Sequence, residues 1–189
     1  MLMKVNAFFL TMMVSLAGMA HGELQVISDL FSDRLKMAAE ATRALNWKVG
    51  DFANYNLSAG FIKGTMKMAV RERSVEGIWV QQDLDLGFAG KQKVETLFDA
   101  ETGEVKKVLV NGKEEQTPLQ DAEVVEVTQS NVTVPAGKFD CLYVITKDSE
   151  GKLSKSWVNP NIIPMVGLIK VQSPSQYGEV NVELTSFKK

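Results

Sequence analysis

The chain is nearly devoid of histidine and cysteine. Of its 189 residues only His21 and Cys141 are of these types. If His21 is lost with an N-terminal leader, no Ser-His-Asp triad, Cys-His pair or histidine zinc site can form. A single cysteine excludes an intramolecular disulfide. We therefore expect no catalytic residue, no metal site and no cofactor, and a protein that is not an enzyme.

The chain also has no excess or cluster of positive charge. It carries 21 basic and 23 acidic residues. A nucleic-acid-binding protein needs clustered Lys and Arg to neutralise phosphates, so we expect no nucleic-acid partner. Carboxylate pairs of the glycosidase kind are still available from Asp83, Asp85, Glu95 and Asp99. Acids at strand spacing are more typical of a solvated sheet face, which is the reading we favour.

Long apolar runs are missing too. The longest is Val5–Leu16, about a dozen residues, whereas a spanning helix needs about 20. Lys4 precedes the run, and the small residues Ala20 and Gly22 follow it. This layout is typical of a secretory signal peptide. We predict that residues 1–22 are removed, with a membrane anchor as the alternative, and that the mature chain has no transmembrane segment.

The segment after the apolar run lacks the cysteine of a lipid-anchored precursor. Leu16, Ala17 and Gly18 are followed by Met19 instead. An acyl chain has no thiol to attach to at this point. We therefore predict a soluble product in the periplasm or outside the cell.

The mature chain, residues 23–189, is long enough for one domain with a sizeable core. From Ser28 to Leu45 apolar residues recur at spacings of three and four, which predicts one helix. Its apolar stripe is expected to pack on the rest of the domain, with a membrane-surface helix as the alternative. No linker composition or internal repeat divides the chain.

Beyond Trp47 the apolar residues recur with a period of two. About nine strands are predicted, joined mostly by short turns, of which Asn111–Gly112 is a strong hairpin signal. Such alternation indicates an antiparallel sheet with one buried face. The predicted fold is mostly β (α+β): a curved antiparallel sheet or half-barrel with one N-terminal helix.

The alternation also predicts which side chains share the buried face. Residues two apart lie on one side of a strand, which places a set of apolar residues on the concave face of the sheet. Trp157 and the loop residues 162–165 are expected near its rim. The loop has two readings: a lip that contacts a ligand, or a segment tucked onto the core. The predicted ligand-binding residues are Met66, Met68, Ile78, Val80, Phe88, Trp157, Ile162, Ile163 and Met165, with Leu84 on the same face.

Cys141 lies in the middle of a predicted strand with apolar neighbours. A buried cysteine behaves as a small apolar side chain, whereas a reactive one needs partial exposure and a positive environment. We favour the buried, inert thiol over the reactive one.

Three stretches, residues 47–55, 132–141 and 156–170, resemble the signatures of a group of exported bacterial β-rich proteins of unknown function. Their order and spacing match, and they bracket most of the mature chain. The group is similar in plan to the lipoprotein carriers LolA and LolB, whose half-barrels have helices over an apolar concave face. The resemblance implies a half-barrel over residues 23–189 and carries no catalytic residue across.

A size argument bears on function. Nine strands make a sheet about 40 Å wide, and the predicted helix is about 27 Å long and about 10 Å across. One helix cannot cover such a face, so either the sheet curls until its own side chains fill it or an apolar groove stays open. We therefore expect non-catalytic binding of an apolar ligand, a lipid or an acylated envelope protein, in the cell envelope. The alternative is a structural or protein-interaction envelope protein with a filled core.

Overall fold

The structure is a computed structural model that describes residues 45–115, 123–148, 150–175 and 178–189. The predicted signal peptide and all of the predicted helix except Leu45 lie outside the described residues. Within these ranges no helix is both long and apolar enough to cross a membrane.

The described residues form eleven strands and one short 3-10 helix, η1 (Gly87–Ala89). The strands are β1 (Phe52–Ala59), β2 (Ile62–Ser74), β3 (Gly77–Asp85), β4 (Lys91–Phe98), β5 (Val105–Val110), β6 (Lys113–Glu114), β7 (Glu123–Val134), β8 (Gly137–Lys147), β9 (Leu153–Val158), β10 (Leu168–Ser175) and β11 (Gly178–Lys188).

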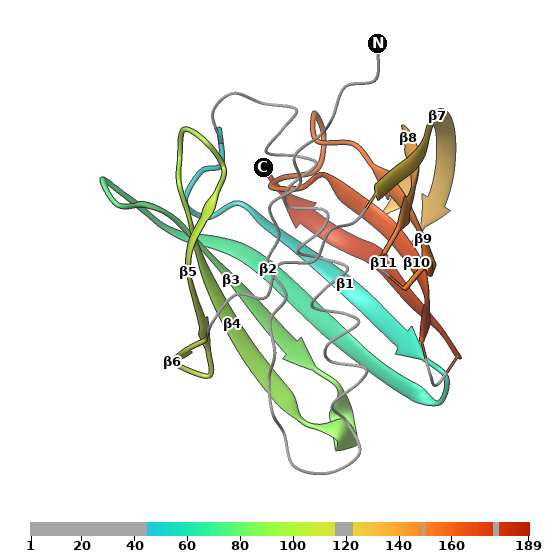
Figure 1. The fold of residues 1–189 in the computed structure, drawn as a ribbon, viewed down its shortest axis with the longest axis horizontal. Coiled ribbons are helices and arrows are strands. Elements are labelled where there is room, and N and C mark those ends of the chain that lie inside the picture. Colours follow the sequence, from blue (N-terminus) through green and yellow to red (C-terminus); the bar gives the residue numbers. More distant parts are fainter. Residues whose placement is uncertain (1–44, 116–122, 149, 176–177) are drawn as a thin grey trace.

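All eleven strands belong to one antiparallel sheet, in the order β6-β5-β4-β3-β2-β1-β11-β10-β9-β8-β7. Strands β1 to β6 form one meander and β7 to β11 form a second, each in sequence order (Figure 1). The meanders meet at the centre, where β1 pairs with β11 and Leu57 lies opposite Val182. The order ends at β6 and β7, so the sheet is not closed.

Local sequence explains the turns between strands. Asn111 and Gly112 both have positive φ, 49° and 81°, and link β5 to β6. This is the backbone that a two-residue hairpin requires and that Asn-Gly adopts at little cost. The hairpin predicted at this dipeptide is confirmed.

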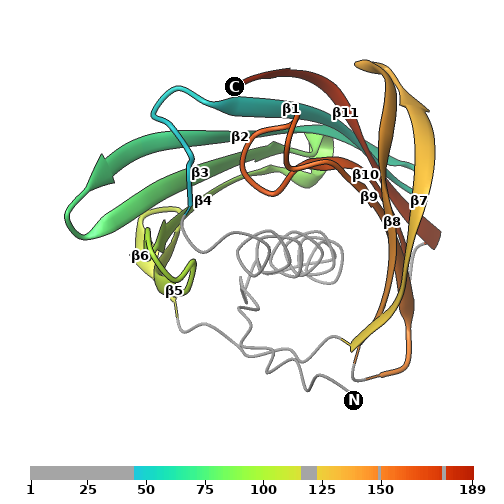
Figure 2. The same cartoon turned by 90° about the horizontal axis from the view of Figure 1, so that it is seen from above.

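The sheet bends into an arc when seen from above (Figure 2). Register shifts at Asn54/Tyr55, Val70/Glu72 and Leu168/Lys170 mark irregularities that increase bending and twist. The β9–β10 loop lies on the inner side of this arc, and its buried residues join the core of β1–β3, β10 and β11. The buried face is therefore the inner, concave face.

The predicted fold class is confirmed, with eleven strands in place of about nine. One addition is β6, which is only two residues long and so gives no alternation to detect. Strand β7 departs from the expected one-sided burial, because Glu123–Gln129 is exposed on both faces at the edge of the sheet.

Candidate functional site

The centre of the inner face is built from β2 and β3. Met66 lies opposite Leu84, and Val70 lies opposite Val80. Met68 is fully buried between them. The predicted grouping on one face is thus observed for the residues of these two strands: Met66, Met68, Ile78, Val80 and Leu84 are all buried and belong to one cluster.

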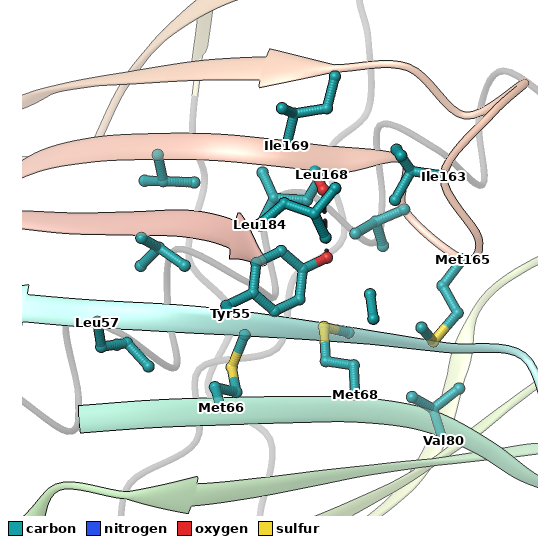
Figure 3. Packing of buried hydrophobic residues seen from close by; sticks show 14 of the residues in the cluster. Tyr55, Leu57, Met66, Met68, Val80, Ile163, Met165, Leu168, Ile169 and Leu184 are labelled. Atoms are coloured by element: carbon teal, nitrogen blue, oxygen red, sulfur yellow. Dashed lines mark hydrogen bonds between the residues drawn. The ribbon is translucent and has the colours of Figure 1, made fainter. Parts of the chain in front are cut away.

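Tyr55 extends the apolar face from β1 across β11. Its ring lies among Leu168, Leu184 and Met68 (Figure 3), and its hydroxyl donates to the Leu168 carbonyl at 3.2 Å. The side chain is 1% exposed, and this burial raises the pKa of its hydroxyl far above the ordinary value of 10.0. The phenol therefore stays neutral and ties β1 to β10.

The loop between β9 and β10 closes one end of this face. Ile163, Met165 and Val166 are buried in the main core, while Ile162 is 45% exposed. Asn159 organises the loop: its backbone nitrogen donates to the Gly167 carbonyl at 2.7 Å, and its side chain accepts from the Asn161 nitrogen at 3.1 Å. Of the four residues 162–165, Ile163, Pro164 and Met165 are thus buried, and Ile162 is the one that remains accessible.

Trp157 lies on the other face of the sheet from the predicted groove. It alternates with Ser156, which is fully buried, and pairs across strands with Tyr143 and Lys170. Its ring centroid lies 5.0 Å from that of Tyr143 and 5.8 Å from Lys170 Nζ. The half-buried ring also packs against the edge of the core. Strand parity therefore turns Trp157 toward the outer face, next to the edge of the core.

Phe88 is not on the inner face either. Strand β3 ends at Asp85, and Phe88 lies in η1, where it is 78% exposed. Gly87 has φ 60° and Gly90 φ 106°, so the strand alternation that was predicted to place Phe88 on the inner face ends before this residue. The ring stacks on Phe61 of the β1–β2 turn instead.

Hydroxyl groups line the inner face on the opposite flank, over β8, β9 and β10, a feature that the sequence analysis missed. Ser154 and Ser173 are hydrogen-bonded at 2.8 Å between their Oγ atoms, and Thr146 lies opposite Ser154. Ser156 is 0% exposed, and its Oγ has no hydrogen-bond partner. We call Thr146, Ser154, Ser156 and Ser173 the hydroxyl cluster. Their shared strand parity with buried Val144 and Val171 is the signal that could have revealed them.

An unpartnered buried hydroxyl costs about 1–3 kcal/mol. Because the hydroxyl cluster and the apolar centre share one face of the sheet, the inner face is amphipathic. It is apolar at β1–β3 and β11, and it can donate or accept hydrogen bonds at the hydroxyl cluster.

The outer face of β1–β4 carries the mid-chain carboxylates. Asp83 and Asp85 border a shallow groove of about 530 Å³, most of whose lining residues are polar. Asp85 pairs with Lys91 at 2.7 Å, and Glu95 pairs with Lys93 at 2.8 Å. Hydrogen bonds from Lys91 and from the Gly87 nitrogen hold the pKa of Asp85 below its ordinary range. A general acid needs the opposite shift, so this arrangement fits a solvated face.

Asp99 has a similar environment. Lys106 Nζ lies 2.7 Å from its carboxylate, and the nitrogens of Thr102 and Glu101 donate to it. These contacts hold its pKa well below the ordinary value. The carboxylate organises the β4–β5 turn.

Cys141 is 5% exposed, with its Sγ 3.6 Å from the Ser130 carbonyl oxygen. Burial, with a smaller contribution from Asp140, raises the pKa of its thiol. The predicted burial of this cysteine is confirmed. In the part of the chain that the structure describes, no three His, Cys, Asp or Glu side chains gather in a way that could hold a metal ion.

These features define a class of protein: a single, unclosed, curved antiparallel sheet with an apolar inner face and buried hydroxyls along one flank. No known family model and no curated protein matches the chain. A solved structure that it resembles is the crystal structure of MucB, at 13% sequence identity and a TM-score of 0.43. The match covers 83% of this chain and 57% of MucB, a little over half of its length.

Proposed function

We propose that the protein binds an amphiphile, a lipid or the acyl group of an acylated protein, on the inner face of its sheet, without catalysing a reaction. The observation that carries the proposal is the amphipathic inner face. Its apolar centre suits an acyl chain, since each buried CH₂ stabilises by about 0.8 kcal/mol. The unpartnered hydroxyl of Ser156 supplies a hydrogen-bonding group for a polar head.

The predicted signal peptide supports a place of action in the periplasm or outside the cell. An amphiphile carrier is useful there, because lipids must cross an aqueous space between membrane surfaces. The absence of a second histidine or cysteine from the sequence supports a binding function over an enzymatic one.

A second candidate is a structural or interaction protein of the envelope with a filled core. It is favoured by the tight burial of the predicted groove residues, since Met68 and Ile78 are 0% exposed and Met66 is 1% exposed. In that case the inner face serves folding alone and takes up no ligand.

Native mass spectrometry of the protein purified from its own envelope distinguishes the two candidates. A retained lipid, together with saturable binding of a fluorescent fatty-acid probe, is the expected result. Protein that carries no lipid and fails to bind the probe would end the amphiphile proposal and leave the filled core.

Ser156→Ala tests the role of the hydroxyl. Removing an unpartnered buried hydroxyl should leave the free energy of unfolding unchanged or raise it by about 1 kcal/mol. The same change should weaken binding of the fatty-acid probe several-fold if the probe's carboxyl group forms a hydrogen bond with Ser156. Ser58→Ala is the matched control, because half-buried Ser58 alternates with the inner-face residues Leu57 and Ala59 of β1. Equal probe affinity in both variants would remove Ser156 from the site.

A further inference from the structure

Two phenylalanines project together from one end of the sheet. Phe61 belongs to the β1–β2 turn and Phe88 to η1, between β3 and β4. They are 74% and 78% exposed. Their ring centroids are 6.0 Å apart with an interplanar angle of 11°. Both turns lie at the same end of the sheet, the lower end in Figure 1, and we call this pair the aromatic tip.

Aromatic residues are unusual at such positions. Turns favour Gly, Pro, Asn, Asp and Ser, and a large apolar side chain gains stability only when it leaves water. Here two separate turns each expose one ring, and the rings meet each other rather than the core. Because the tip projects from the end of the sheet, its two rings can enter a soft apolar medium without a matching groove.

The charges around the tip are close to balanced. Lys63 is exposed, and Lys91 forms an ion pair of 2.7 Å with Asp85. Gly178, at the start of β11, lies close to Gly60, and the next residue, Glu179, accepts hydrogen bonds from the Gln172 and Asn181 side chains. Long lysine side chains can extend their charge toward water while their stems stay in an apolar layer. The tip can therefore enter the polar–apolar boundary of a bilayer without burying an unpaired carboxylate.

We infer that the aromatic tip is a membrane-contact site that inserts its two rings into the boundary region of a lipid bilayer. The partner is the bilayer surface itself, of zwitterionic or weakly anionic composition. Phenylalanine and lysine are the residue types that peripheral membrane elements use at this depth. The inference goes beyond the inner-face ligand and holds whether or not that face takes up an amphiphile.

Flotation of the full chain with phosphatidylcholine vesicles tests the inference. We expect the unaltered protein to float with vesicles and Phe61→Ser/Phe88→Ser to lose at least about tenfold in partition, since two exposed rings are removed. Val75→Ser is the matched control, because Val75 is fully exposed in the β2–β3 turn at the other end of the sheet. Thermal unfolding confirms that the variants fold, as expected for exposed positions.

A probe attached beside the tip provides a second readout. In a Cys141→Ala background, a nitrobenzoxadiazole dye on Lys63→Cys should shift to the blue and be quenched by brominated lipids when vesicles are added. The same dye on Val75→Cys should not respond.

Three results would overturn the inference. They are an unaltered protein that does not float, a double variant that floats as well as the unaltered chain, and a dye that responds equally at both ends. A concentration-dependent dimer that the double variant abolishes, with no vesicle binding, would instead identify the tip as a contact between two copies.

Discussion

Gly167 packs directly against Pro160 across the base of the β9–β10 loop. A Cβ atom added to Gly167 would overlap the backbone nitrogen and Cα of Pro160, and Gly167 has φ 70°. Both space and backbone conformation therefore require glycine at this position. This contact holds the loop in the form that buries Ile163 and Met165.

Gly167→Ala should lower the free energy of unfolding by at least about 3 kcal/mol, since overpacking adds to the cost of the left-handed backbone. Gly112→Ala is the control, because Gly112 has φ 81° but no atom within 4 Å of an added Cβ. It should cost only about 1–2 kcal/mol. Urea unfolding measures both values, and equal losses would show that the contact with Pro160 is unimportant.

Stability should fall in alkaline solution because of Tyr55. Its pKa is raised by burial in the folded state and is ordinary, 10.0, in the unfolded chain. Above about pH 10 the unfolded chain loses this proton while the folded chain keeps it, so the unfolded state is favoured. The expected slope is about −1.4 kcal/mol per pH unit.

Tyr55→Phe removes both this titration and the bond to Leu168. The variant should lose about 1 kcal/mol at pH 7 and show a shallower decline above pH 10. Urea unfolding between pH 7 and 11 measures the slope. An unchanged slope in the variant would mean that other groups cause the alkaline loss.

Two adjacent loop residues should respond differently to a charge. Ile163→Asp places a carboxylate in the core and should cost about 4 kcal/mol or more, whereas Ile162→Asp, at a side chain 45% exposed, should cost less than about 1 kcal/mol. If Ile162 also contacts an entering ligand, its variant weakens fatty-acid probe binding at unchanged stability. Similar destabilisation by both variants would contradict the observed burial.

The thiol of Cys141 should be unreactive in the folded protein. Burial and the raised pKa both reduce the amount of accessible thiolate at pH 7. Labelling by a neutral maleimide should be at least about a hundredfold slower than in urea-unfolded chain, because it must wait for opening of the structure. Equal rates in the two states would place the thiol at the surface.

Period-two alternation was sufficient to predict the buried faces of β2 and β3, since each of their inward positions touches a neighbouring strand. It failed where the backbone leaves the strand: Gly87 and Gly90 turn Phe88 out to solvent. It also failed where chemistry and parity disagree. Trp157 was predicted near the rim of the concave face, whereas the small polar Ser156 holds the inward position beside it.

The β1–β11 pairing could not be predicted from local patterns. Hydrogen bonds such as that from Asn54 Nδ2 to Ser186 Oγ, at 2.9 Å, join residues 132 positions apart. The register there depends on tertiary packing and not on the turn that sets a hairpin. The hydroxyl cluster was missed for a related reason, because its members are brought together by the pairing of β8, β9 and β10, which local patterns do not show.

The central position of the β1–β11 pair affects how the chain matures. The first meander emerges from the ribosome long before its neighbour β11, so it waits with an open edge on β1 at what will become the middle of the sheet. The fold can therefore be completed only after nearly the whole sequence has been made. Until β11 has been made, the two meanders cannot join into one sheet, because β1 has no other partner on that edge.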